Sequence, residues 1–248
     1  MRADSTLSSG EKMFKRTTFI LGLLLAAPVL ADEEAESLWS GKATLGYLAT
    51  SGNTDNSNLN TGFDLTYTPG EWKHALELRA IYATEDNAAT TESYRAAWNS
   101  ERSITDNDFL FGRLDWRKNR FSTYERQFSQ TVGYGRRLIN TEKYALNVTA
   151  GAGARQSDIA TGTTENEAIL RGGLNYAWQL SGTAEIRQDL AVEAGDKNTY
   201  VESITALSAQ LVGNLALVAS YTVKHNTDVL PFTEKTDTYT ALSLEYLF

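Results

Sequence analysis

Large apolar residues alternate with polar residues along most of the chain from Trp39 onward, and turn-forming residues interrupt the alternation at regular intervals. A period of two is typical of β-strands that present different faces to different surroundings. In one segment, Leu114 and Trp116 share a face opposite Asp115 and Arg117. The chain contains about twelve such segments of roughly 10–14 residues, which is the length that a tilted strand needs to cross a bilayer.

Connections between these segments alternate in length. Compact turns, as at 68–71 and 181–182, alternate with longer polar stretches, as at 157–165 and 226–235. Short turns at one rim and longer loops at the other are typical of outer-membrane barrels, and an even number of strands places both chain ends at the short-turn rim. We therefore predict an all-β fold, a transmembrane antiparallel up-and-down β-barrel of about 12 strands. The segments with the clearest alternation are 59–67, 76–82, 110–117, 170–179, 186–193, 215–224 and 242–248.

Composition agrees with a barrel and excludes other membrane folds. The mean hydropathy of −0.36 excludes a bundle of membrane helices but not a barrel, because only alternate residues of a barrel strand face lipid. The chain has 12 Tyr, 5 Trp and 9 Phe but only 3 Pro, a balance that favours strands. A soluble β-sandwich also alternates, but it would not place charges on the second face of strand after strand. Aromatic residues near segment ends are expected to form interfacial girdles: Trp39, Tyr67, Trp72, Trp178, Tyr246 and Phe248.

The N-terminal region has the order of parts found in a secretory signal. Lys15 and Arg16 precede a short apolar run that ends at small residues suited to cleavage. We interpret 1–31 as an over-called translation start plus a signal peptide, 32–38 as a short periplasmic lead-in, and 39–248 as the barrel. The expected location is the bacterial cell outer membrane, with outer-membrane lipid as one partner.

The polar face of the predicted strands carries charges of both signs, which makes the lumen the candidate site. The residues predicted to line it are Glu77, Arg79, Arg113, Asp115, Arg117, Arg171, Glu185, Arg187, Asp189, Glu193 and Glu245; Lys42, Asp64, Arg95, Arg137, Arg155, Glu202 and Lys224 follow the same pattern. Two arrangements satisfy such charges: a hydrated channel, or ion pairs that fill the interior. Twelve strands lie between the eight that side chains fill and the sixteen that leave an aqueous channel. Both interpretations therefore stay open.

Catalytic and binding motifs are scarce in the sequence. The net charge of −8 argues against a nucleic-acid partner, and the absence of Cys excludes disulfides and thiol chemistry. The two histidines, His74 and His225, are expected at opposite rims, and Asp228 follows His225 by three residues. No metal-binding spacing occurs, so we expect neither a metal nor another cofactor. A non-enzymatic barrel is the first hypothesis; an outer-membrane hydrolase and a loop-mediated interaction or anchoring barrel are the alternatives.

Three stretches resemble one known family. They are "GYLATSGNT" at 46–54, "ERQFSQTVGYGRRLI" at 125–139, and the final "LSLEYLF". Together they resemble the family of salt-induced outer-membrane proteins, an outer-membrane β-barrel domain of unknown function. The resemblance implies a fold, a location and a response to salt, but no substrate, catalytic residue or cofactor. The ending at Phe248 also looks like the terminal signal recognised by the barrel-assembly machinery, which is therefore an expected partner.

Overall fold

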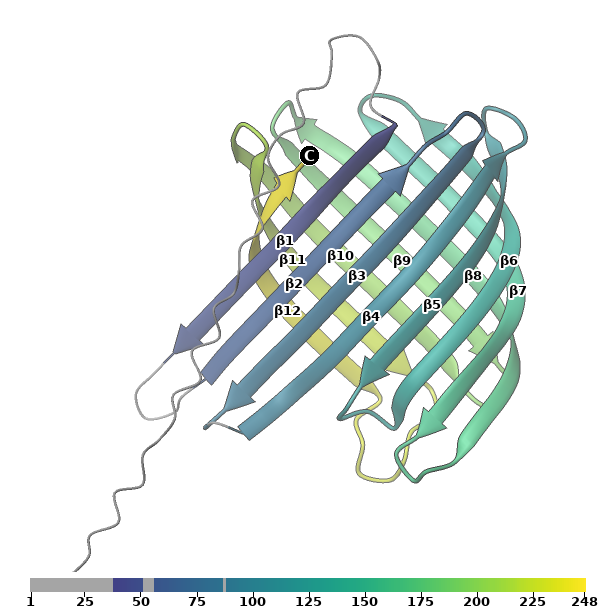
Figure 1. Cartoon of the computed structure of the whole chain (residues 1–248), viewed down its shortest axis with the longest axis vertical. Helices are drawn as coiled ribbons and strands as arrows, with labels where there is room; N and C mark the ends of the chain where they lie inside the picture. Colours follow the sequence, from purple (N-terminus) through teal and green to yellow (C-terminus); the bar gives the residue numbers. More distant parts are fainter. Residues whose placement is uncertain (1–37, 51–55, 87) are drawn as a thin grey trace, which may run out of the picture. The chain divides into compact units, whose positions relative to one another are not determined.

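The computed structural model describes residues 38–50, 56–86 and 88–248, and within them it contains twelve β-strands. They are β1 (Trp39–Thr50), β2 (Asn56–Tyr67), β3 (Trp72–Glu85), β4 (Ala88–Ser103), β5 (Asp108–Asn119), β6 (Tyr124–Asn140), β7 (Tyr144–Ile159), β8 (Thr164–Ser181), β9 (Ala184–Gly195), β10 (Thr199–Val212), β11 (Leu215–Asn226) and β12 (Thr236–Leu247). Each strand pairs antiparallel with the next, and β12 pairs with β1 to close the barrel (Figure 1). The predicted fold is confirmed.

The predicted signal peptide lies outside the described residues, as does the predicted lead-in except for Leu38. No helix in the described part of the chain is long and apolar enough to cross a membrane.

The two rims differ less in loop length than the sequence predicts. Short turns at one rim include 182–183 and 213–214, and the chain's C-terminus lies at this rim in Figure 1. At the other rim the predicted loop 157–165 is wrong, because β7 continues to Ile159 and β8 begins at Thr164. Backbone pairing continues through polar positions there, as between Ser157 and Glu165. The alternation of apolar and polar residues stops where the apolar belt ends, but the backbone hydrogen bonds between the strands continue beyond it. The sequence pattern therefore underestimates the length of the strands.

The outer wall presents the apolar face of the strands. Leu110, Leu114 and Trp116 on β5 are 52%, 44% and 37% exposed, whereas the intervening Asp115 is 1% exposed. Large apolar side chains that remain exposed over many strands mark a surface suited to contact with lipid. Alternation along the chain therefore corresponds to a physical division between the outer wall and the lumen.

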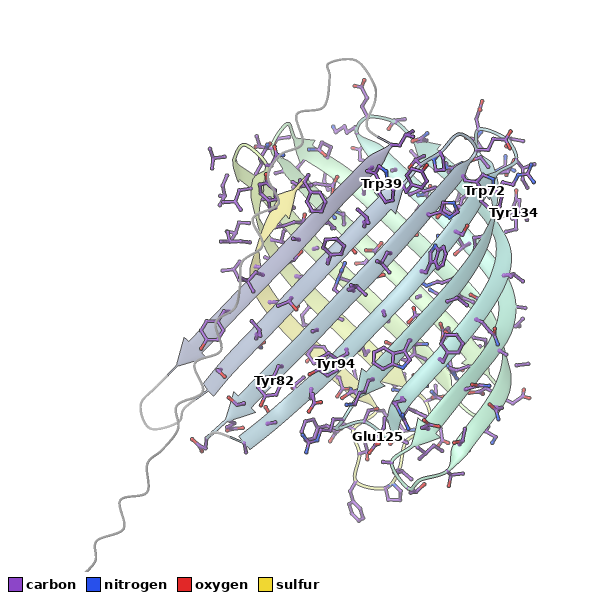
Figure 2. The ribbon with its side chains drawn as sticks, in the orientation of Figure 1. Trp39, Trp72, Tyr82, Tyr94, Glu125 and Tyr134 are labelled. Atoms are coloured by element: carbon purple, nitrogen blue, oxygen red, sulfur yellow. The ribbon has the colours of Figure 1, made fainter. Side chains whose placement is uncertain are left out.

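Aromatic side chains gather near both edges of the apolar belt. Trp39 stacks on Tyr67 with 4.3 Å between ring centroids, and Figure 2 shows Trp39 and Trp72 near the short-turn rim. Tyr82 and Tyr94 lie toward the opposite rim in the same view. Amphipathic rings at these heights suit the two membrane–water interfaces, as the sequence predicts.

Glycines on the inner face of β6 and β7 let two phenylalanine rings lie against the wall. A Cβ atom at Gly133 would come within 2.6 Å of the Cα of Gly151 and 2.7 Å of Cε1 of Phe111. The rings of Phe109 and Phe111 are 3% and 6% exposed. Small residues here relieve crowding inside the barrel, because backbone and ring atoms occupy the space of a side chain.

The variant Gly133→Val is expected to fold poorly. Its side chain would meet backbone as well as the Phe111 ring, and overpacking of this kind costs about 1–3 kcal/mol or more. The folded fraction after refolding in detergent, measured by the mobility shift of unboiled samples in gels, checks this result. Gly112→Val on β5 is the matched control, because no atom lies within 4 Å of its added Cβ. Equal folded fractions for the two variants would contradict the argument.

Candidate functional site: an ionic lumen

The inward side chains form one connected network of ion pairs. Ten of the eleven predicted lumen residues belong to it; Asp189 instead accepts a 2.6 Å hydrogen bond from Asn175. Each carboxylate of the network contacts at least one cation, so opposite charges neutralise one another without bulk water. Its cations are Lys42, Arg79, Arg95, Arg113, Arg117, Arg155, Arg171, Arg187 and Lys224, and its anions are Asp64, Glu77, Asp115, Glu167, Glu185, Glu193, Glu202 and Glu245.

One ion pair bridges the full width of the lumen. Nη1 of Arg95 on β4 lies 2.6 Å from Oε2 of Glu202 on β10, and these strands are six apart in the ring of twelve. The same guanidinium donates to Asp115 through Nε at 3.2 Å and Nη2 at 2.6 Å. Asp115 and Glu202 are 1% and 5% exposed. Because two donors meet one carboxylate, the Arg95 side chain is held firmly across the barrel.

Glu193 on β9 contacts three guanidinium groups. Nη2 of Arg117 and Nη1 of Arg171 each lie 2.5 Å from its oxygens, and Nη1 of Arg155 lies 3.5 Å away. The hydroxyl of Ser129 donates a further bond at 3.3 Å. Glu193 is fully buried. A buried carboxylate is stable only with such partners. Arg171 pairs with Glu193, whereas Arg117 and Arg155 also contact Asp115 and Glu167.

Loop contacts cover the network on the side of the longer loops. Nη2 of Arg155 donates to the carbonyl oxygen of Asn198 at 2.5 Å, and the Asn198 side chain accepts from the backbone N–H of Asp228 at 3.2 Å. The backbone N–H of Leu230 donates to Oγ1 of Thr123 at 2.9 Å. The connection 227–235 therefore folds inward and is anchored to the connections 196–198 and 120–123.

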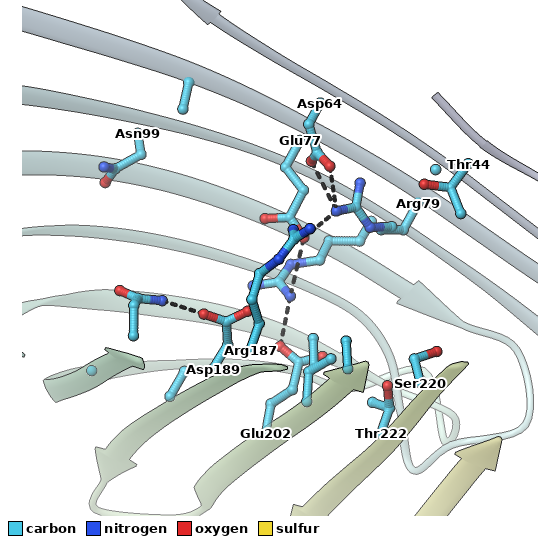
Figure 3. Close-up of a pocket in the computed structure, with 18 of the residues that line it drawn as sticks. Thr44, Asp64, Glu77, Arg79, Asn99, Arg187, Asp189, Glu202, Ser220 and Thr222 are labelled. Carbon is cyan, nitrogen blue, oxygen red and sulfur yellow. Dashed lines mark hydrogen bonds and ion pairs between the residues drawn. The ribbon is translucent and has the colours of Figure 1, made fainter. Parts of the chain in front are cut away.

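A cavity of about 600 Å³ remains in the lumen beside these contacts. Figure 3 shows Asp64, Glu77 and Arg79 pointing into the same space as Arg187 and Glu202. The predicted residues that line it are Glu77, Arg79, Arg113, Arg171, Arg187, Asp189 and Glu245. The other four are held in contacts: Asp115, Arg117 and Glu193 in the buried pairs, and Glu185 against Arg187.

A second cavity, of about 170 Å³, shares one residue with the first. Its lining consists of Thr90, Thr91, Asn119, Phe121, Asp237, Thr238 and Tyr239. Tyr239 lines both cavities, and Nζ of Lys224 lies 5.2 Å from the centre of its ring. The Tyr239 side chain therefore separates the lumen cavity from a space at the end of β12.

The sequence analysis did not identify three residues that contact the ionic network or the loops that cover it. Glu167 pairs with Arg155 at 2.7 Å, and it lies on the face of β8 that carries Arg171. Continuing the period-two pattern back from Arg171 would have identified it. Asn198 and Thr123 carry no such signal, because they lie in connections where polar residues are ordinarily solvated.

The two histidines lie outside the lumen. Nδ1 of His74 lies 3.0 Å from the hydroxyl oxygen of Ser100 on the outer wall, beside the Trp72 ring. Nδ1 of His225 lies 2.8 Å from the hydroxyl oxygen of Thr236. Asp228 follows His225 by three residues, but among the described contacts it donates its backbone N–H to Asn198 and does not meet the imidazole.

A closed barrel with an apolar outer wall, aromatic girdles and an ionic lumen is an outer-membrane β-barrel fold. Comparison with known proteins places the chain further: residues 43–248 match the model of the family described as "Protein of unknown function, DUF481", and the chain belongs to that family. The uncharacterized protein YdiY of Escherichia coli (strain K12) is 30% identical over 213 residues, covering 86% of this chain and 84% of that protein. The sequence-based assignment to an outer-membrane barrel family of unknown function is thus confirmed.

Solved structures agree in fold. An outer-membrane channel from Pseudomonas putida F1 superposes with a TM-score of 0.51 at 8% identity, covering 85% of this chain and 95% of that one. The NanC porin gives a TM-score of 0.49 at 9% identity, covering 84% of this chain and 97% of that one. At these identities the likeness concerns the fold alone.

Proposed function

We propose that this protein is a non-enzymatic barrel of the bacterial outer membrane that conducts ions and small polar solutes through a narrow route. The observation that carries the proposal is the cavity of about 600 Å³ lined by charges of both signs. It offers water-sized space beside a network that otherwise fills the interior. If the lumen were only a structural core, its side chains would be expected to fill the interior and leave no cavity of this size.

The Arg95–Glu202 bridge makes the route eccentric. This pair spans the barrel from β4 to β10, so a solute must pass to one side of it. Residues of all twelve strands line the cavity, and Thr44, Asn60 and Ser220 contribute small polar side chains to it. Basic side chains outnumber carboxylates among the residues that line the cavity, and we therefore expect a preference for anions.

Refolded protein in planar lipid bilayers is expected to give small, resolvable current steps. The steps should be well below those of wide porins, because long side chains cross the lumen. Under a gradient of potassium chloride the reversal potential should have the sign of an anion preference, because basic side chains outnumber carboxylates along the cavity. No current steps over a wide range of salt concentration would remove the pore and leave the ionic lumen a structural role.

Location and assembly belong to the same proposal. Phe248 exchanges backbone hydrogen bonds with Gly41 across the closing seam, donating at 2.9 Å and accepting at 2.7 Å. We infer that this terminal residue is read by the barrel-assembly machinery before it takes that place. The family resemblance suggests a role under salt or osmotic stress, and an ion route across the outer membrane could serve such a role. Survival of a deletion strain after salt shock tests it.

The contact between His74 and Ser100 suggests a second candidate, a lipid hydrolase on the outer wall, but the other contacts of His74 argue against it. A serine nucleophile needs a base that a third group orients. Within the described residues, His74 contacts Ser100 and the rings of Tyr67, Trp72 and Trp98, and none of these is a carboxylate or amide. We expect hydrolysis of phospholipid vesicles to stay at background and not to change in the double variant His74→Ala, His225→Ala. Activity that both replacements abolish would establish the hydrolase instead.

A further inference from the structure

A row of polar side chains crosses the apolar outer wall of β8 to β12. Five residues in direct register form it: Tyr176, Gln188, Thr205, Tyr221 and Thr240. Tyr176, Gln188, Thr205 and Tyr221 face outward, because residues beside them in sequence line the lumen. Thr240 pairs directly with Tyr221 and therefore lies on the same face. Along each of β9, β10 and β11, apolar outward residues lie on both sides of the row, so it runs through the belt that lipid would cover.

The row is not satisfied by its own hydrogen bonds. Oγ1 of Thr205 donates to Oε1 of Gln188 at 2.5 Å, and Nε2 of Gln188 donates to the Ser203 hydroxyl at 2.9 Å. Among the residues that the structure describes, the hydroxyls of Tyr176, Tyr221 and Thr240 have no hydrogen-bond partner. Lipid acyl chains supply neither donors nor acceptors, so these hydroxyls would remain unpaired against lipid.

The same wall ends at an incompletely paired strand edge. Across the seam, the paired positions of β1 and β12 end at Leu45 and Leu244 within the described residues. Beyond them Tyr47 and Leu242 are 67% and 63% exposed, among the more exposed large side chains of the barrel. An open sheet edge is not stable against lipid, because its backbone groups lack partners. The polar row and this edge therefore form one continuous surface that lipid covers poorly.

We propose that this wall, from Tyr176 on β8 to the edge of β12, packs against a second copy of this chain in the membrane. Hydroxyl and carboxamide groups both donate and accept, so the row complements itself when two copies are related by rotation about the membrane normal. Two copies insert in the same orientation, and the row then lies at the same depth in each. Thr205, the central member, falls at the middle of the contact.

Cysteine crosslinking tests the contact directly, since the chain has no native Cys. The full chain carrying Thr205→Cys is expressed in outer membranes, oxidised with copper phenanthroline and run on non-reducing gels. We expect a disulfide-linked dimer in at least severalfold higher yield than for Leu114→Cys. Leu114 is the matched control because it is 44% exposed on the outer face of β5, five strands from β10.

Two further measurements keep the proposal testable. If Thr205→Cys fails to fold, Leu207→Cys, the next outward position on β10 and 46% exposed, replaces it. The combined variant Gln188→Leu, Thr205→Val, Tyr221→Phe should lower the co-purification of two differently tagged copies severalfold while keeping the folded gel mobility. Crosslinking no greater than at Leu114, or dimers that persist unchanged in the apolar variant, would overturn the interface. Neither readout depends on whether the barrel conducts.

Discussion

Glu193→Gln is expected to destabilise the barrel strongly. The change removes the negative charge that faces Arg117, Arg171 and Arg155, and it leaves three guanidinium groups close together. Removing one partner of a buried ion pair costs about 3–5 kcal/mol, because the remaining charge stays buried without compensation. The free energy of unfolding, from urea titration of the protein in lipid vesicles, measures this loss.

Asp189→Asn is the control for that experiment. Asp189 also faces the lumen, but its side chain accepts a hydrogen bond from Asn175, which an amide can keep in part. We expect a loss below about 1 kcal/mol for this variant, in the range of an ordinary neutral hydrogen bond. Adding Arg171→Gln to Glu193→Gln should restore part of the lost stability, because the two sites share one interaction. If Glu193→Gln is as stable as Asp189→Asn, the network does not hold the barrel together.

Tyr239→Ala is expected to raise the single-channel conductance severalfold. The side chain of Tyr239 separates the lumen cavity from the second cavity, so its removal joins the two spaces. A side chain that separates two spaces limits passage between them, so its removal should widen the proposed route. Single-channel recording in planar bilayers, with wild type and variant in the same lipid and salt, provides the comparison.

Tyr82→Ala serves as the control for this prediction. Tyr82 lies on the outer wall of β3 and is 41% exposed, so its loss leaves the lumen unchanged. Equal conductance for Tyr239→Ala and wild type, with both proteins conducting, would place the route elsewhere in the lumen. Added conductance in the Tyr82 variant would instead indicate that any aromatic replacement loosens the barrel.

Alternation along single strands predicts the fold and the inward charges well. Asp115 and Arg117 face the lumen because Leu114 and Trp116 face out, and this relation depends only on neighbouring residues. The predicted loop bounds at 157–165 were wrong because they depend on pairing between two strands. The pairing of β7 with β8 continues where the pattern of hydrophobicity stops. The short spacing of His225 and Asp228 does not bring them together among the described contacts, because spacing in sequence does not determine where a loop backbone turns.

By itself, the sequence determined a barrel of about twelve strands and the face on which each charge lies. These properties are local, since a strand repeats every two residues and each face must meet either lipid or lumen. Only the tertiary structure decided that Arg95 meets Glu202, 107 residues away, and that Asn198 covers Arg155. Such contacts depend on the closure, register and width of the barrel, which bring strands far apart in the chain within reach of one another. The same geometry decided that the charged lumen keeps a cavity beside its ion pairs instead of being wholly open or wholly filled.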